Sequence, residues 1–265
     1  MKLDIKQKDQ IVPIWKPVGV STHTIAIQAA KAFGVPVAHT GILDPIAEGV
    51  VIILTGETRF QKYTLAGLTK EYVFNLLFGI GTDTYDLMGI IKKVDTEFTL
   101  DRAKLKTVSK SFVKSYKQVY PPFSAKVVKG KPLHYHAQMG TLDLIKIPTI
   151  DATIYELELL ELGKISAGNV YKEALSKIGK TESYFRQDLV LPSWEKFKKT
   201  HDQKNIFNTA SFRCVVSRGV YIRSISVEIA EALGTCGLAE SLVRTKNGEY
   251  TKENSFDYQQ LLALL

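Results

Sequence analysis

Residues 39–49 read H-T-G-I-L-D-P-I-A-E-G and lie between two segments of regular pattern. An amphipathic helix pattern ends before this stretch, and the apolar residues 50–54 follow it directly and predict a buried strand. Two glycines and Pro45 mark the stretch as a loop, and Pro45 holds Asp44 outside the helical region. A stiff loop that presents one carboxylate suits a nucleophile. An Asp-Pro turn with a purely structural role has the same local pattern.

Composition and charge limit the class of protein. Of the 265 residues, 45% are hydrophobic and 23% are charged, as expected for a globular protein with a substantial core. Lysine and arginine number 35 against 27 acidic residues, and the formal charge of +8 favours a polyanionic partner. Cys214 and Cys236 form no C-x-x-C motif, so free thiols in a reducing compartment are expected. No apolar run reaches membrane-spanning length, which predicts a soluble cytoplasmic protein without membrane contact.

The regular segments predict a mixture of strands and helices. Strands are expected at residues 11–15, 50–55, 72–78, 153–160 and 211–216. Ser21 is the expected N-cap of a helix that runs to about Phe33 and ends at Gly34. In the strand at 72–78 the even positions are all large and apolar or aromatic, so they should share one face.

The stretch around Asp44 resembles the signature of the TruB family of pseudouridine synthases, which is roughly G-H-T-G-x-L-D-P-x-A-x-G-x-L. Three positions depart from it: Ala38 replaces the leading Gly, Glu48 stands where Thr is common, and Val51 replaces the last Leu. About ten matching positions in one run make this a specific resemblance.

Other segments resemble family motifs in the same order along the chain. Residues 16–22, K-P-V-G-V-S-T, are similar to K-P-x-G-x-S-S, which shapes the floor of the family's active site. Residues 70–72 resemble K-x-Y, and residues 81–86 resemble G-x-x-T-D-T-x-D, for which a structural turn is the favoured role. Residues 217–225 are similar to C-S-x-G-T-Y-I-R-x-L and open a helix that ends near Leu233. The segment at 238–244 resembles the family's final L-x-x-L-R-R element.

The resemblance implies a set of site residues. Asp44 would be the nucleophile, Arg223 would pair with it and keep it ionised, and Tyr72 would stack on the uracil and assist proton transfer. Substrate contacts would come from His39, Lys16, Tyr221, Leu242, Lys126 and Lys131. A core tyrosine and a solvated lysine remain the alternatives for Tyr72 and Lys16. No cofactor is implied, and no metal is expected, because the pair of histidines at 134 and 136 lacks a third ligand nearby.

Two lysine-rich segments follow. Residues 101–140 hold nine lysines or arginines and one acid, with aromatic residues between them, which suits a nucleic-acid surface but also a solvated face. Within them, residues 118–126 and 130–135 resemble a mobile family loop, so a basic RNA-clamping loop is expected near 118–150. Residues 163–207 are polar, lysine-rich and without clear periodicity, and they predict an insertion. The chain ends about where many relatives continue into an RNA-binding PUA domain, so none is expected.

Together these features predict one catalytic domain over residues 1–265, of mixed α/β (α+β) class, with a largely antiparallel central sheet, flanking helices and a cleft. By resemblance, the protein would be a monomer that flips a uridine of tRNA, uridine 55 in the T-arm, and isomerises it to pseudouridine. Whether Asp44 attacks the base or the sugar is open. An RNA-binding or RNA-folding factor on the same fold is one alternative, against which the intact Asp44, Tyr72 and Arg223 argue. A Cbf5-type guided synthase is the other, against which the expected lack of a PUA domain argues.

Overall fold

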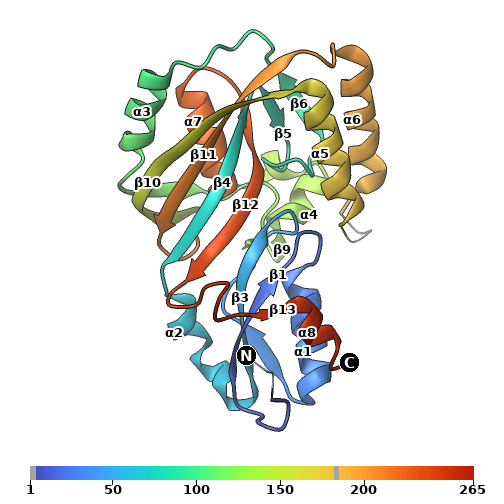
Figure 1. Cartoon of the computed structure of the whole chain (residues 1–265), viewed down its shortest axis with the longest axis vertical. Coiled ribbons are helices and arrows are strands. Elements are labelled where there is room, and N and C mark those ends of the chain that lie inside the picture. Colours follow the sequence, from blue (N-terminus) through green and yellow to red (C-terminus); the bar gives the residue numbers. More distant parts are fainter. Residues whose placement is uncertain (1–3, 182–184) are drawn as a thin grey trace.

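The computed structural model describes residues 4–181 and 185–265 as an elongated α+β molecule built on one central sheet (Figure 1). The strands of this sheet are β1 (Ile11–Lys16), β2 (Val37–His39), β3 (Glu48–Thr55), β4 (Lys70–Phe78), β7 (Ser115–Val119), β10 (Thr149–Ser166), β11 (Ile206–Val216), β12 (Gly237–Asn247) and β13 (Phe256–Asp257). Their order is β13-β1-β3-β12-β4-β11-β10-β7, and β2 pairs with β3. Only the β1–β13 and β3–β12 pairs are parallel, so the predicted fold class and the largely antiparallel sheet are confirmed.

Helices and two small hairpins complete the chain. The helices are α1 (Thr22–Phe33), α2 (Lys62–Ala66), α3 (Arg102–Ser111), α4 (Leu133–Gln138), α5 (Ala167–Gly179), α6 (Gln187–Thr200), α7 (Ile222–Ala232) and α8 (Tyr258–Leu262), with short 3₁₀ turns at Gly56–Gln61 and Leu142–Leu144. The hairpins pair β5 (Ile80–Thr82) with β6 (Ile91–Val94), and β8 (Val127–Val128) with β9 (Lys131–Pro132). In Figure 1, α1 and α8 lie beside the lower strands, and α3, α5, α6 and α7 surround the upper ones.

Local sequence signals explain where α1 and β4 form. The Ser21 hydroxyl accepts a hydrogen bond from the backbone of Thr24 at 2.9 Å, and Gly34 ends α1 with a positive φ of 65°, as predicted. Along β4 the even positions from 72 to 78 are all buried, which confirms their shared face. One of them, Phe74, stacks on Phe212 of the neighbouring β11 with 5.4 Å between ring centroids. The centre of the sheet is therefore held by aromatic cross-strand packing.

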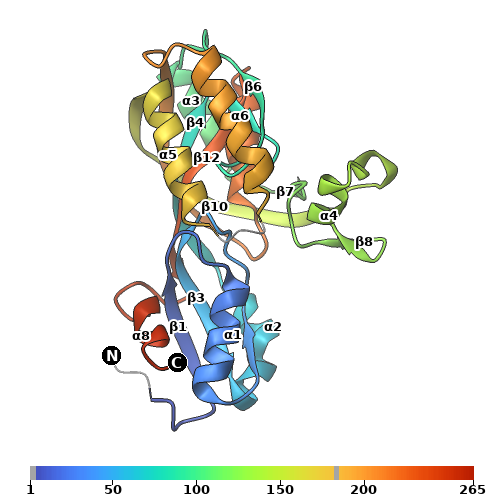
Figure 2. The ribbon, with the colours of Figure 1, turned by 90° about the vertical axis from the view of Figure 1, so that its right-hand side faces the viewer.

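The prediction that residues 163–207 lack periodicity was wrong. β10 and β11 pair as far as Ser166 and Ile206, so residues 167–205, called the insertion below, connect the two strands of a hairpin. Most of the insertion is the helix pair α5 and α6, which lies along the upper half of the molecule (Figure 2). The buried positions follow a helical spacing of three and four residues: Ala167, Val170, Tyr171, Ala174 and Ile178 in α5, and Val190, Trp194 and Phe197 in α6. They form a second hydrophobic core with Leu77, Phe207 and Leu238 of the sheet.

The basic segment also connects the two strands of a hairpin. β7 and β10 pair from Ser115 with Thr153 to Val119 with Thr149, and residues 120–148, called the arm below, lie between them. The arm carries α4 and the β8–β9 hairpin and projects from the body of the molecule (Figure 2).

Candidate active site

The loop that carries Asp44 is fixed by backbone contacts from three sides. The carbonyl of Pro45 accepts a hydrogen bond from the backbone N–H of Gly19 at 2.8 Å, and the hydroxyl of Thr22 accepts one from the backbone of Leu43 at 3.0 Å. Lys16 is fully buried, and its ammonium donates to the carbonyl of Ala47 at 2.5 Å. The structure therefore places Lys16 beneath the loop rather than on the surface of the cleft.

Gly49 lies at the end of the Asp44 loop, where β12 pairs with β3. Its φ is +125°, and a Cβ atom at this position would lie 2.3 Å from the carbonyl oxygen of Arg244. Only glycine combines this backbone conformation with such a close approach of a second strand. The last glycine of the 39–49 stretch is thus required by the packing of β12 against β3.

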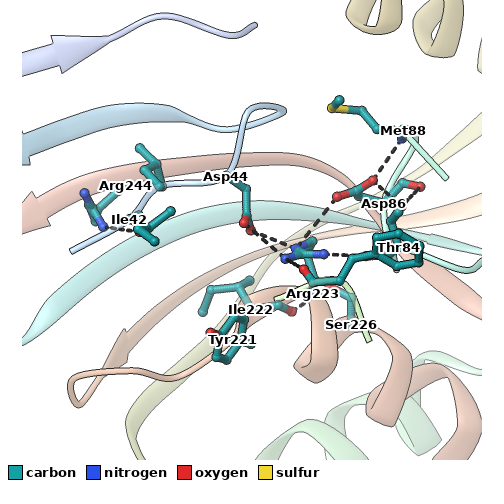
Figure 3. A network of polar contacts seen from close by, with 12 residues as sticks. Ile42, Asp44, Thr84, Asp86, Met88, Tyr221, Ile222, Arg223, Ser226 and Arg244 are labelled. Carbon is teal, nitrogen blue, oxygen red and sulfur yellow. Dashed lines mark hydrogen bonds and ion pairs between the residues drawn. The ribbon is translucent and has the colours of Figure 1, made fainter. Parts of the chain in front are cut away.

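Asp44 and Arg223 form a two-pronged ion pair at the start of α7 (Figure 3). The Nε of Arg223 donates to one carboxylate oxygen of Asp44 at 2.7 Å, and Nη2 donates to the other at 3.1 Å. Arg223 is buried, whereas 25% of the Asp44 side chain is exposed. The planar guanidinium therefore holds the carboxylate in one orientation and leaves part of it open to a ligand.

Two backbone carbonyls also accept hydrogen bonds from Arg223. Nη1 donates to the carbonyl of Thr84 at 2.6 Å, and Nη2 donates to that of Phe123 at 3.1 Å. Its Nε lies 3.7 Å from a carboxylate oxygen of the buried Asp86. Burial by itself lowers the pKa of Arg223, but the carboxylates of Asp44 and Asp86 raise it above its usual value, so the guanidinium stays charged.

Asp86 is a site residue that the sequence interpretation missed. Its carboxylate accepts hydrogen bonds from the hydroxyl of Thr84 at 2.6 Å and from the backbone of Met88 at 2.9 Å, as Figure 3 shows. Burial raises the pKa of Asp86, and Arg223 and Thr84 oppose that rise. The sequence signal that could have identified Asp86 was the match of residues 81–86 to a family motif. A polar turn of this composition favoured only a structural role.

Tyr72 and Lys70 lie on the wall of the same cleft. Burial raises the pKa of the Tyr72 hydroxyl, and the nearby guanidinium of Arg244 only partly offsets this, so the phenol stays protonated at neutral pH. Burial, together with Arg244 and Arg218, lowers the pKa of Lys70 to about 8. The Lys70 ammonium donates to the carbonyls of residues 66 and 68 at 2.7 and 2.5 Å, which places it at the base of β4 rather than beside Asp44.

His39, Tyr221 and Leu242 also line the cleft, whose volume is about 1100 Å³. Burial, mainly, raises the pKa of Tyr221 to about 12, with a further contribution from the charge of Asp44. The backbone of Tyr221 is held by the buried Gln118, which accepts from its N–H at 2.8 Å and donates to its carbonyl at 3.2 Å. Burial lowers the pKa of His39, and Lys62 and His23 lower it further, so this imidazole is neutral at pH 7.

Lys126 and Lys131 are not brought to this cleft. Both are exposed on the arm, where their ammonium groups lie 5.5 and 5.3 Å from the ring centroids of Tyr120 and Tyr135, respectively. The imidazole of His136 in α4 faces the Thr141 hydroxyl and the Val128 carbonyl, both at 3.1 Å. Within residues 4–181 and 185–265, no three His, Cys, Asp or Glu side chains gather as metal ligands.

Arg244 is the second site residue without a predicted role. Its Nε donates to the carbonyl of Val50 at 2.6 Å, and Nη1 donates to that of Ile42 at 3.4 Å. The guanidinium thus joins both ends of the Asp44 loop to β12, and Figure 3 shows its contact with Ile42. It also lies close to the hydroxyl of Tyr72. The sequence signal that could have identified Arg244 as a site residue was its position in the segment that resembles L-x-x-L-R-R.

Comparison with solved structures defines the class of fold. The chain superposes on Cbf5 in a crystal structure of a Cbf5–Nop10–Gar1 complex with a TM-score of 0.60 and 19% identity, over 97% of this chain and 55% of that one. A second match is to Cbf5 in an archaeal box H/ACA Nop10–Cbf5 complex, with a TM-score of 0.56 and 18% identity. The chain therefore spans about half the length of these Cbf5 chains and shares their α+β fold.

Sequence comparison then gives the family. Residues 31–175 match the family described as TruB family pseudouridylate synthase (N terminal domain). The tRNA pseudouridine synthase B of Caldanaerobacter subterraneus subsp. tengcongensis is 30% identical over 96% of this chain and 74% of that protein. The enzyme of the same name from Aquifex aeolicus is 31% identical over the same shares. The chain belongs to the TruB family of pseudouridylate synthases.

Proposed function

We propose that this enzyme isomerises uridine 55 in the T-arm of tRNA to pseudouridine, with Asp44 as the nucleophile. The observation that carries the proposal is the two-pronged pair of Asp44 and Arg223 in a cleft of about 1100 Å³. Relatives named tRNA pseudouridine synthase B, about 30% identical over most of the chain, support tRNA as the substrate. A flipped nucleoside fits such a cleft, whereas a stacked base in a helix could not reach Asp44.

In this mechanism Arg223 supplies the opposite charge that a partly buried carboxylate needs, and it aims the exposed part of Asp44 at the bound nucleoside. The bond between N1 of the uracil and C1′ of the ribose breaks, the uracil turns while it is held in the cleft, and its C5 forms a bond to the same C1′. C5 then loses its proton and N1 takes one up, so the product is an isomer of the substrate. Asp86 and the Thr84 carbonyl keep Arg223 in place as this charge distribution changes. The fold contributes to catalysis by holding Asp44 and Arg223 in position before the reaction begins.

Tyr72 supplies the flat surface on which the uracil stacks, and its protonated hydroxyl can donate a hydrogen bond or a proton. Tyr221 and Leu242 close the cleft around the base, and His39 packs against the displaced RNA loop as a neutral ring. Lys126 and Lys131 act from the arm by binding phosphates. Lys16 contributes through the loop it supports.

The proposal includes that the protein acts as a monomer in the cytoplasm, without a metal or a cofactor. In the part of the chain that the structure describes, no helix is both long enough and apolar enough to span a bilayer. Guided modification within a ribonucleoprotein is the weaker alternative, because the Cbf5 structures share 18–19% identity and support the fold alone. The purified chain should therefore modify tRNA without partner proteins.

The test is Asp44→Asn, assayed for pseudouridine in a tRNA transcript and for tRNA affinity. Loss of the charged nucleophile should abolish turnover and leave Kd within about twofold, because base contacts and phosphate contacts are untouched. Glu48→Gln is the matched control, since Glu48 is the other acid of residues 39–49, and it should remain active. Appreciable turnover by Asp44→Asn would remove Asp44 as the nucleophile.

A further inference from the structure

Arg186 lies where the polypeptide enters α6, and its side chain leaves the insertion towards the cleft. Its Nη1 lies 3.0 Å from one carboxylate oxygen of Asp83, and Nη2 lies 3.2 Å from the other. The guanidinium also stands 4.0 Å from the centre of the Phe123 ring. One side chain of the insertion therefore contacts the loop between β5 and β6 and the base of the arm at once.

Each of the two residues that Arg186 contacts, Asp83 and Phe123, lies next to or carries a backbone carbonyl that binds Arg223. Thr84, which follows Asp83 directly, accepts a hydrogen bond from Arg223 Nη1 at 2.6 Å, and the carbonyl of Phe123 accepts one from Nη2 at 3.1 Å. Asp83 is tied to its own loop as well, since it accepts from the backbone of Ile90 at 2.8 Å. A shift of Asp83 or Phe123 would therefore move a carbonyl that orients Arg223.

We propose that Arg186 is a positioning residue, which joins the 83–84 loop to the base of the arm and so fixes the two carbonyls that orient Arg223 towards Asp44. The inference rests on the proposed isomerisation for its readout. It gives the insertion a role in the chemical step, in addition to whatever RNA its surface lysines contact. Displacement of a catalytic group by about 1 Å, even through residues far from the chemistry, can cost about 100-fold in rate.

Contacts of described residues near Arg186 tie the insertion to the rest of the molecule. The Gln187 amide donates to the carbonyl of Thr181 at 3.1 Å and so ties the start of α6 to the end of α5. That end of α5 abuts the turn before α1, because a Cβ atom on Gly19 would lie 2.1 Å from the carbonyl oxygen of Lys180. Ile46, two residues after Asp44, is buried in the core that α5 and α6 build. The insertion thus touches the Asp44 loop as well as the two segments that Arg186 joins.

The charge of Arg186 is already matched within the protein. Both carboxylate oxygens of Asp83 face it, and only 13% of its side chain is exposed. A phosphate ligand would need a more exposed guanidinium with free donors. The geometry of this side chain therefore favours a role towards Arg223 over one towards RNA.

The experiment compares Arg186→Ala and Arg186→Lys with Lys199→Ala, which removes the same charge from an exposed position of the same insertion. For each variant kcat, KM, Tm and the tRNA Kd at several salt concentrations are measured. Arg186→Ala should lower kcat by about 10- to 100-fold and leave KM, Kd and its salt dependence unchanged within about twofold. Arg186→Lys should fall between, because a lysine can pair with Asp83 but cannot lie flat on Phe123. Lys199→Ala should match the wild type.

Phe123→Leu alone and combined with Arg186→Ala shows whether the effect passes through the arm. The double variant should lose little more kcat than Arg186→Ala, since both changes break one chain of contacts. If Arg186→Ala melts below the assay temperature, the lysine variant carries the same kcat comparison.

Two results would overturn the inference. One is a wild-type kcat in both Arg186 variants. The other is a weaker Kd with unchanged kcat and a salt slope reduced by about 0.7 to 0.9, which would make Arg186 a phosphate ligand. A wild-type protein that modifies no tRNA uridine would instead contradict the proposed function, so the two failures are distinguishable.

Discussion

The arm and the insertion are attached to opposite ends of β10, and both are rich in lysine, yet they fold in different ways. The arm projects from the body of the molecule (Figure 2). Apolar side chains on it, such as Val127 and Leu144, are exposed. The insertion folds into two helices that bury Trp194 and Phe197 against the sheet. Segments of similar charge in similar hairpin positions have thus become a projecting surface and a part of the core.

The difference comes from where apolar residues fall, because lysines tolerate either structure. In the insertion the apolar residues recur at helical spacing, and they pack against one face of β4, β11 and β12. In the arm the helix α4 has six residues, and only Leu133 and His136 are buried in it. A segment with so little burial keeps its lysines and aromatic rings available for a ligand.

The largest effect is expected from a mutation in the hydrophobic core of the insertion. Trp194 is fully buried, and Trp194→Ala should lower the free energy of unfolding by about 3 to 5 kcal/mol, through lost burial and a new cavity. The measurement is denaturant unfolding followed by far-UV circular dichroism.

Leu144→Ala in the arm is the matched control. The residue is 72% exposed, so its loss should change stability by no more than about 0.5 kcal/mol. A small effect of Trp194→Ala as well would mean that α5 and α6 unfold independently of the sheet, and the contrast between the two segments would fail.

A smaller effect concerns RNA binding by the same two segments. Reversal of three exposed arm charges, Lys126, Lys129 and Lys131 to Glu, should weaken tRNA binding by about tenfold or more and reduce the salt slope by about 2 to 3. Titration of labelled tRNA at four salt concentrations gives both quantities.

Reversal of three exposed insertion charges, Lys196, Lys199 and Lys204, changes the net charge equally and serves as the control. It should alter Kd by less than about threefold, because long-range attraction is largely screened at 0.15 M salt. Equal losses in both triple variants would show that only total charge matters and that the arm is no specific clamp.

The smallest expected effect is a pH dependence where the insertion meets β12. Burial raises the pKa of Glu240, and the nearby Lys177 opposes the rise. A raised native pKa means that the contribution of Glu240 to stability is present at low pH and lost as the pH rises through that pKa. Glu240→Gln should therefore be more stable than the wild type at pH 7, and the difference should shrink towards pH 4.

Unfolding titrations between pH 4 and pH 8 measure this difference. Lys177→Met is the complementary variant, because loss of its charge should raise the pKa of Glu240 further and enlarge the advantage of Gln at residue 240. A difference that does not vary with pH would mean that Glu240 is solvated and that the insertion is packed less tightly than its buried residues indicate.

Short-range signals predicted much of the fold and part of the site. The cap at Ser21, the end of α1 at Gly34 and the alternation in β4 depend on contacts within a few residues, and all three were confirmed. The roles of Asp44, Tyr72 and Arg223 came from family resemblance and remain predictions. The insertion was misinterpreted because its two apolar stripes are short and separated by polar residues, so that neither stands out over the whole segment.

The sequence by itself determined the family, the loop that carries Asp44 and the local caps and strands, because these depend on neighbouring residues or on a contiguous motif. Family resemblance predicted that Arg223 pairs with Asp44, but the contact itself exists only in the tertiary structure, since the two residues are 179 positions apart and the order and register of the strands bring them together. The same holds for Asp86, Arg244 and Arg186, whose partners lie on other elements. Their roles follow from burial and from distances between atoms, and both exist only once the sheet is assembled.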